Sequence, residues 1–116
     1  MGNLILNIAK DYSRCPGARY ESEGDYSGER FREDFLAPKL KEAIEAGVKL
    51  EVILDGSAGY STSFIEESFG GLIRTNGYSL DVLKDKIIII SNEDPTYIDD
   101  IYEYWDHAWE NCNKTT

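Results

Sequence analysis

Three short apolar runs along the chain have the composition of β-strands. They cover Leu4–Ile8, Leu50–Leu54 and Ile87–Ile90, and each is rich in leucine and β-branched residues. The last run is apolar at every position, which predicts a central strand covered on both faces. The polar residues 11–28 predict a loop, with a short strand at Ala18–Ser22, paired with the first strand as a hairpin, as an alternative.

The first segment with helical periodicity begins near Gly28. Ser27 precedes it and is a favoured N-cap residue, and Gly47 supplies the end. Pro38 falls inside the segment, which predicts a kink or a break into two shorter helices. The apolar positions of its buried face are Phe31, Phe35, Leu36, Leu40 and Ile44.

Two further helices follow the second and third strands. Ser63 is the expected cap of the first, because Glu66 stands three residues later and completes a capping box. The pair Asn76-Gly77 ends that helix, and Asp94 is the expected cap of the last one. The apolar stripes are Ile65, Phe69, Leu72 and Ile73 in the first, and Ile98, Ile101, Tyr102, Trp105 and Trp109 in the second.

Strands that alternate with helices predict an α/β fold. We expect a small layered domain with a mixed, largely parallel central sheet and helices packed on it, formed by residues 1–116 as one unit. In such sheets, binding sites gather at the carboxyl ends of the strands. The sequence therefore predicts the functional site at Asp55–Ser63 and Ser91–Asp94.

The charge is strongly acidic and unevenly distributed. The formal net charge is −10, of which −3 falls on residues 1–58 and −7 on residues 59–116. Because nucleic-acid binding rests on Lys and Arg contacts, a nucleic-acid partner is not expected, and an anionic membrane is disfavoured for the same reason. The seven acids between Glu93 and Glu110 are expected to form a solvated face, with docking of a basic partner as the alternative.

A cytoplasmic location is expected from the cysteines and the apolar runs. Cys15 and Cys112 are the two cysteines and lie far apart in sequence, which is typical of reduced thiols. The longest apolar run has four residues, whereas a membrane helix needs about 20. The N-terminal residues lack the basic start and long apolar core of a signal peptide.

The loop between Asp55 and Phe64 is the most unusual segment, with two glycines and four hydroxyl residues before a capped helix. A helix N-terminus favours a phosphate, yet no Gly-Lys-Ser/Thr follows these glycines, which excludes a P-loop. A serine nucleophile would need a base, and the one histidine, His107, lies in the last helix. Ser63 is expected to cap the helix. Ser61, Thr62 and Ser63 also remain candidates for phosphorylation or partner contact.

Two further features carry a structural interpretation. Gly70-Gly71 inside a helical stripe costs about 1 kcal/mol per glycine, which suggests close approach of a backbone, either from the sheet beneath or from a partner helix above. Arg19, Arg30 and Arg32 lie among many acids and are expected to form exposed ion pairs of small energetic value. One of them could instead orient Asp55 or the hydroxyl loop.

Paired carboxylates leave an enzyme as the alternative. Asp55 and Asp94 follow two strands and could bind Mg²⁺, as in a receiver-like domain or a small enzyme. A receiver also needs an acidic pair after the first strand and a late lysine, and Asp11 and Lys86 match these poorly. No Cys/His spacing typical of a zinc site is present, so no metal and no cofactor are expected.

Two segments of the chain resemble a known family. The run LEVILDGSAGYSTSFIEESFGGLIRTNG carries a Ser-Phe-x-Glu-Glu-x-Phe-Gly-Gly-Leu motif, and GARYESEGDYSGERFREDFLAPKL carries Ser-Gly-Glu-x-Phe-Arg at the start of a helix. Both resemble the STAS-like family of unknown function, which is related to bacterial anti-sigma factor antagonists. The resemblance extends over roughly Leu4 to Ala108.

The resemblance implies a role in signalling through protein–protein contacts. In STAS domains an ATP-binding kinase of the histidine-kinase type phosphorylates a serine in an Asp-Ser-Ser-Gly turn at a helix N-terminus. That turn corresponds here to residues 61–64, but no Asp precedes the hydroxyls, and Phe64 stands where glycine would.

We therefore interpret the chain as a non-enzymatic regulatory module that binds a protein, with a histidine-kinase-type ATP-binding protein as the expected partner. A homodimer is also compatible with the sequence. The expected contact surface is the hydroxyl loop, the exposed side of the following helix and, as an extension, residues 11–28. Its candidate residues beyond the three hydroxyls are Gly56, Ser57, Gly59, Tyr60, Phe64, Glu67, Gly70, Gly71 and Arg74.

Overall fold

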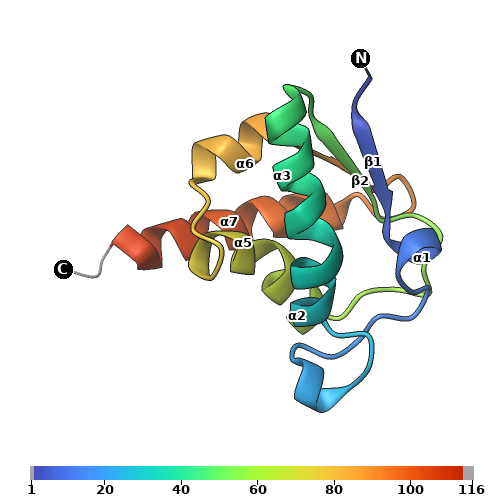
Figure 1. Cartoon of the computed structure of the whole chain (residues 1–116). Coiled ribbons are helices and arrows are strands. Elements are labelled where there is room, and N and C mark those ends of the chain that lie inside the picture. Colours follow the sequence, from blue (N-terminus) through green and yellow to red (C-terminus); the bar gives the residue numbers. More distant parts are fainter. Residues whose placement is uncertain (1, 114–116) are drawn as a thin grey trace.

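The computed structural model describes residues 2–113 and contains a parallel β-sheet with helices packed on it (Figure 1). Its strands are β1 (Leu4–Asn7), β2 (Leu50–Ile53) and β3 (Ile87–Ile90), in the spatial order β1-β2-β3. Leu4 is paired with Leu50, and Leu50 with Ile87, so the three apolar runs align in register. The predicted α/β fold class is thus confirmed, with a sheet that is wholly parallel.

The position of β3 corrects one prediction. The all-isoleucine strand lies at an edge of the sheet, and β2 is the central strand. Ile88 is 37% exposed and shares its face of the sheet with Ile5, which is 55% exposed, whereas Ile87 and Ile89 are buried. An unbroken apolar run was therefore insufficient to identify the central strand.

The segment between β1 and the first long helix also differs from one alternative. α1 (Ile8–Asp11) follows β1 directly, and a 3₁₀ turn at Glu21–Glu23 stands where a hairpin strand was considered. The backbone oxygens of Ala18 and Arg19 instead accept the N–H groups of Gly28 and Glu29 at the start of the next helix. These bonds hold the segment against a helix end and away from β1.

The first long helical run consists of α2 (Gly28–Phe31), a π-helical turn at Arg32–Leu36 and α3 (Ala37–Ala46). Ser27 caps it by accepting the Arg30 N–H, and Gly47 ends it with φ of 71°, both as predicted. Pro38 does not break the helix, because the chain forms a wider turn immediately before it, in which the Ala37 N–H donates to the Arg32 oxygen. The π-turn accommodates the irregularity that a proline without an N–H imposes.

The second long helical run consists of α4 (Thr62–Ile65), a π-helical turn at Glu66–Gly70 and α5 (Gly71–Arg74). α6 (Leu80–Lys86) leads into β3, and α7 (Thr96–Asn113) follows it. α7 packs along α5 and the second π-turn, where the Trp105 indole N–H donates to the Phe69 oxygen at 3.0 Å. α3 packs against β1 and β2 (Figure 1).

The buried apolar side chains form one core between the sheet and these helices. It is built mainly from the three strands, the two long helical runs and α7. None of the helices within residues 2–113 has the length and apolar character needed to cross a bilayer. The largest fully buried apolar side chains are Trp105, Phe31, Phe64, Phe69, Ile8, Leu36, Leu40, Leu50, Leu54, Ile65 and Leu72.

Candidate functional site

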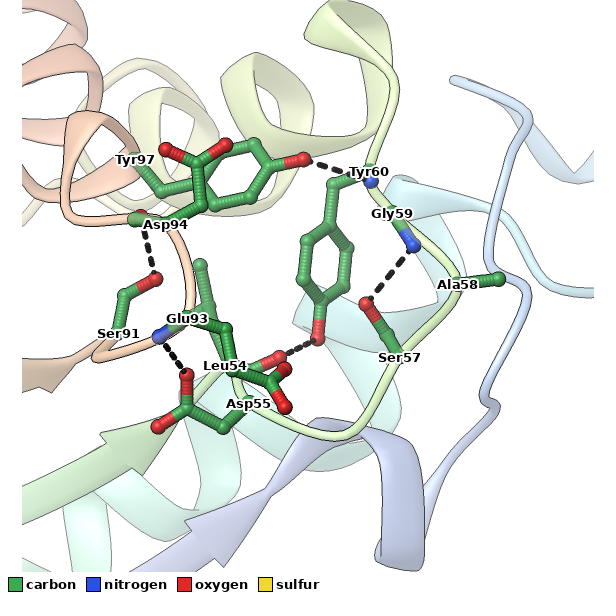
Figure 2. Close-up of a pocket in the computed structure, with 10 residues that line it drawn as sticks. All are labelled: Leu54, Asp55, Ser57, Ala58, Gly59, Tyr60, Ser91, Glu93, Asp94 and Tyr97. Carbon is green, nitrogen blue, oxygen red and sulfur yellow. Dashed lines mark hydrogen bonds between the residues drawn. The ribbon is translucent and has the colours of Figure 1, made fainter.

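A pocket of about 230 Å³ opens at the carboxyl edge of β2 and β3, where the sequence predicts the site (Figure 2). Because the two strands are parallel, the loops that follow them meet at the same edge of the sheet. The lining residues are Leu54, Asp55, Ser57, Ala58, Gly59 and Tyr60 from the first loop, Ser91, Glu93 and Asp94 from the second, and Tyr97 from the first turn of α7.

Asp55 ties the two loops together. Its carboxylate accepts the backbone N–H of Glu93 at 2.8 Å and that of Asn92 at 3.1 Å. In return, the Glu93 carboxylate accepts the Gly56 N–H at 2.8 Å. The Glu93 N–H, together with the backbone and side-chain N–H groups of Asn92, holds the pKa of Asp55 below its ordinary value. Asp55 therefore acts as an ionised bridge that fixes the shape of the pocket rim.

Two tyrosines form the wall of the pocket next to the hydroxyl loop. The Tyr60 hydroxyl donates to the Leu54 oxygen at 2.7 Å, and the Tyr97 hydroxyl accepts the Tyr60 N–H at 3.0 Å. Their rings meet edge to face with centroids 5.3 Å apart. Burial raises the pKa of Tyr60 to about 12, so this hydroxyl remains a donor at physiological pH.

The two aspartates of the Mg²⁺ alternative point in different directions. The Asp94 carboxylate accepts the N–H and the hydroxyl of Thr96 at the start of α7, as expected of a cap. In Figure 2 it lies across the pocket from the Asp55 carboxylate. Within residues 2–113, no group of three or more His, Cys, Asp or Glu side chains is arranged to hold a metal ion.

The helix cap is Ser61, which corrects the prediction of Ser63. The Ser61 backbone is extended, its hydroxyl accepts the Phe64 N–H at 3.1 Å, and it donates to the Gly17 oxygen at 2.7 Å. Glu66 is not available for a capping box, because it pairs with two arginines. Of the three hydroxyl candidates, Ser61 and Thr62 are exposed and Ser63 is half-buried.

Residues 11–28 lie beside this loop. Besides the Ser61 contact with Gly17, the Ala58 N–H donates to the Arg14 oxygen at 2.8 Å. The hydroxyl loop and the segment around Arg14–Gly17 therefore present one continuous surface.

Four of the residues assigned to the partner surface are buried. Phe64 has no exposed surface, Glu67 is 5% exposed, and Gly70 and Gly71 are also buried. The reason is that α2 and α7 cover both sides of the helical run Thr62–Arg74. These four residues are thus corrected to interior positions, whereas Arg74, at the end of the run, is exposed as expected.

The interior side of this helical run contains a buried ion pair that sequence reasoning missed. Arg32, 2% exposed, places Nη1 2.5 Å from Glu67 Oε2 and 2.8 Å from the Glu67 backbone oxygen. Its Nη2 donates to the more exposed Glu33 at 2.9 Å. Arg32 is therefore a core residue, in contrast to the exposed surface pair expected for it.

Two more arginines extend the ion pair into a network. Arg19 contacts Glu66 at 2.6 Å and Glu67 at 3.3 Å, and Arg74 contacts the same residues at 2.8 Å and 3.3 Å. Arg32, Arg19 and Arg74 thus surround Glu66 and Glu67, and no described contact links an arginine to Asp55. Arg30 is the one of the three predicted surface arginines that forms an exposed pair, with Asp34 at 3.5 Å.

The glycine pair makes room for this network. A Cβ atom on Gly71 would lie 2.2 Å from Arg32 Nη1, and one on Gly70 would lie 2.6 Å from Glu66 Oε2. The close neighbours of the two glycines are therefore the charged side chains of Arg32 and Glu66, and not the sheet or a partner helix. Two adjacent glycines, three and four residues after Glu67, were the signal in the sequence that could have indicated a buried charge.

Comparison with known proteins identifies one family. A family model described as a STAS-like domain of unknown function matches residues 27–97, which includes both π-turns and the loops of the pocket. Neither the curated proteins nor the solved structures contain a significant match.

Proposed function

The chain belongs to the STAS-like domain family, and from this membership and the geometry of its hydroxyl loop we propose that it is a regulatory module that binds another protein. The contact surface in this proposal consists of residues Gly56–Thr62 of the hydroxyl loop together with Arg14–Gly17. The expected partner is an ATP-binding protein of the histidine-kinase type, which phosphorylates Thr62. In this proposal the chain carries out no chemistry itself.

The observation that carries the proposal is the position of Thr62. It is the first residue of the helical run, it is exposed, and it follows a serine whose hydroxyl is already used as the cap. Hydrogen bonds hold the loop on both sides, so Thr62 is presented on a fixed surface.

The electrostatics around Thr62 favour a phosphate more than the sequence suggested. A phosphate adds about −1.5 to −2 charge, which Glu66 and Glu67 one turn later would repel. In the structure both carboxylates are paired with arginines, which offset that repulsion. The N-terminus of the helical run adds a favourable interaction of about 0.3–1 kcal/mol.

The proposal is tested with the histidine-kinase-type ATP-binding protein encoded nearest to this chain. The chain is incubated with that protein and ATP, and its intact mass is measured. We expect one added phosphoryl group, absent in Thr62→Ala and retained in Thr75→Ala, which changes an exposed threonine at the far end of the same helical run.

A pull-down with the same protein separates contact from phosphorylation. Complex formation that is weakened by Ala58→Arg on the loop, but not by Thr75→Ala, would support the contact surface even without phosphate transfer. If neither a phosphoryl group nor a complex is detected, the proposal is wrong for this partner class.

A further inference from the structure

One edge of the sheet is open on the side of β1. Within residues 2–113, β1 pairs with β2 alone. The Leu4 N–H donates to the Lys49 oxygen, which shows that Leu4 and Leu6 direct their backbone groups toward β2. Because alternate residues of a parallel strand bond to the same neighbour, the N–H and C=O of Ile5 point toward the open edge.

Ile5 is also the most exposed large apolar residue of the described chain, at 55%. Exposed apolar residues are common singly, but this one lies on an unpaired strand edge. Edge strands with unpaired backbone groups are templates for the addition of another strand.

A groove of about 500 Å³ runs along this edge. Ile5 and Leu6 line one side, and the other side is formed by Phe35, Pro38, Lys39 and Glu42. Pro38, Lys39 and Glu42 follow Phe35 by three, four and seven positions. This spacing places all four on one face of the helical run Gly28–Ala46. The helical run therefore forms one wall of the groove, opposite Ile5 and Leu6 of β1.

The charge of the groove selects among possible occupants. Asp11, Asp34 and Glu42 line it with one base, Lys39, and Arg30 pairs with Asp34 from outside the lining, so the groove remains acidic on a chain of net charge −10. Edge-to-edge pairing with a second copy would bring two identical acidic rims together. A basic segment would instead be attracted to the groove.

We propose that the open edge of β1 binds an extended, basic segment of a partner protein, which adds a fourth strand to the sheet. Its backbone pairs with Ile5, an apolar side chain packs against Phe35 and Pro38, and Lys or Arg side chains approach Asp34 and Glu42. The Asn7 N–H is already bonded to the Asp11 carboxylate, so the added strand ends there. This surface shares no residue with the hydroxyl loop, and it does not depend on the function proposed for that loop.

The test uses a capped heptapeptide of alternating lysine and valine, titrated into the ¹⁵N-labelled chain and followed by amide chemical shifts. We expect shifts concentrated in β1 and along Phe35–Glu42. Ile5→Lys, a change at an exposed position, is expected to abolish binding, because a charge on the edge repels the basic strand. Asp34→Asn and Glu42→Gln are each expected to weaken binding about threefold, whereas Glu110→Gln on α7 leaves it unchanged.

Two matched peptides distinguish strand addition from charge attraction. The first replaces lysine with glutamate, and the second carries N-methyl groups that prevent strand pairing. Equal binding of either one, or binding that survives Ile5→Lys, would overturn the proposal. So would sedimentation that shows a dimer of the chain which Ile5→Lys dissociates, because the edge would then belong to a second copy.

Discussion

Replacement of Glu67 by methionine tests the buried charge network most directly. Glu67 has a side chain that is 6% exposed, and Arg32 has one that is 2% exposed. When Glu67 is removed, Arg32 keeps only Glu33, whose side chain is 46% exposed, as a carboxylate partner. A buried cation then loses its main counter-charge.

The expected loss follows from this geometry. Removal of one partner of a buried pair costs about 3–5 kcal/mol, and we expect Glu67→Met to lie in this range. Arg32→Met should cost less, about 2–3 kcal/mol, because Glu67 retains contacts to Arg19 and Arg74 at 3.3 Å each. The double variant should be less destabilised than Glu67→Met alone, since no charge remains unpaired at the site.

Unfolding in urea, followed by tryptophan fluorescence, measures these differences. Trp105 is buried and bonded to the Phe69 oxygen, two residues from Glu67, so it reports on the packing of this region. For a chain of this size, 3–5 kcal/mol corresponds to a decrease in Tm of about 12–20 °C. The matched control is Glu33→Met, which removes the exposed carboxylate partner of the same arginine and should cost less than about 1 kcal/mol. Equal costs for Glu67→Met and Glu33→Met, or a double variant equal to the sum of its parts, would refute the reasoning.

Three further predictions concern the same helical run. Ser61→Ala should lower the free energy of unfolding by about 1 kcal/mol, and Ser63→Ala by less than about 0.5 kcal/mol, because only Ser61 caps the helix. Burial disfavours the charged form of Glu66, but hydrogen bonds from Arg74 and Arg19 outweigh it and lower its pKa from the ordinary value of 4.5. The contribution of Glu66 to stability is therefore complete above pH 4.5 and is lost as the pH falls through its lower pKa in the folded state. Glu66→Gln should remove this contribution to the pH dependence of stability, as measured in acid unfolding curves. Gly71→Ala should destabilise by about 1–3 kcal/mol in thermal unfolding because its Cβ would meet Arg32, whereas Gly17→Ala, with no atom within 4 Å, should be neutral.

The elements of the fold were largely predictable because their signals are local. Apolar runs placed all three strands within one residue, and Ser27 and Gly47 marked the ends of the first long helical run. Strand order is not a local property, because it depends on which strands pair with one another across distant segments of the chain. The composition of β3 alone therefore predicts a central strand, whereas β3 lies at an edge of the sheet.

The location of the pocket was predictable from the parallel α/β topology, but the contacts of its residues were not. The carboxyl edge of a parallel sheet brought Asp55 and Glu93 together, as expected from their places after two strands. Ser61, which caps the helix in place of Ser63, also bonds to Gly17, forty-four residues away in sequence. Likewise, the partners that bury Arg32 and occupy Glu66 come from distant segments, and no window of sequence contains both sides of these contacts.

The charge network links the segment before the first long helix to the surface proposed for partner binding. Arg19 is bonded to Glu66, and the neighbouring Gly17 is bonded to Ser61, one residue before Thr62. A phosphate or partner that displaces the Ser61–Thr62 backbone must therefore break the Gly17 contact, and the segment held by Arg19 is the part of the fold that would respond. β1 lies outside both this set of contacts and the residues matched by the family model. A change at Thr62 is accordingly expected to alter amide shifts around Gly17 and Arg19 and to leave those of Ile5 unchanged, so the two proposed surfaces can be supported or rejected separately.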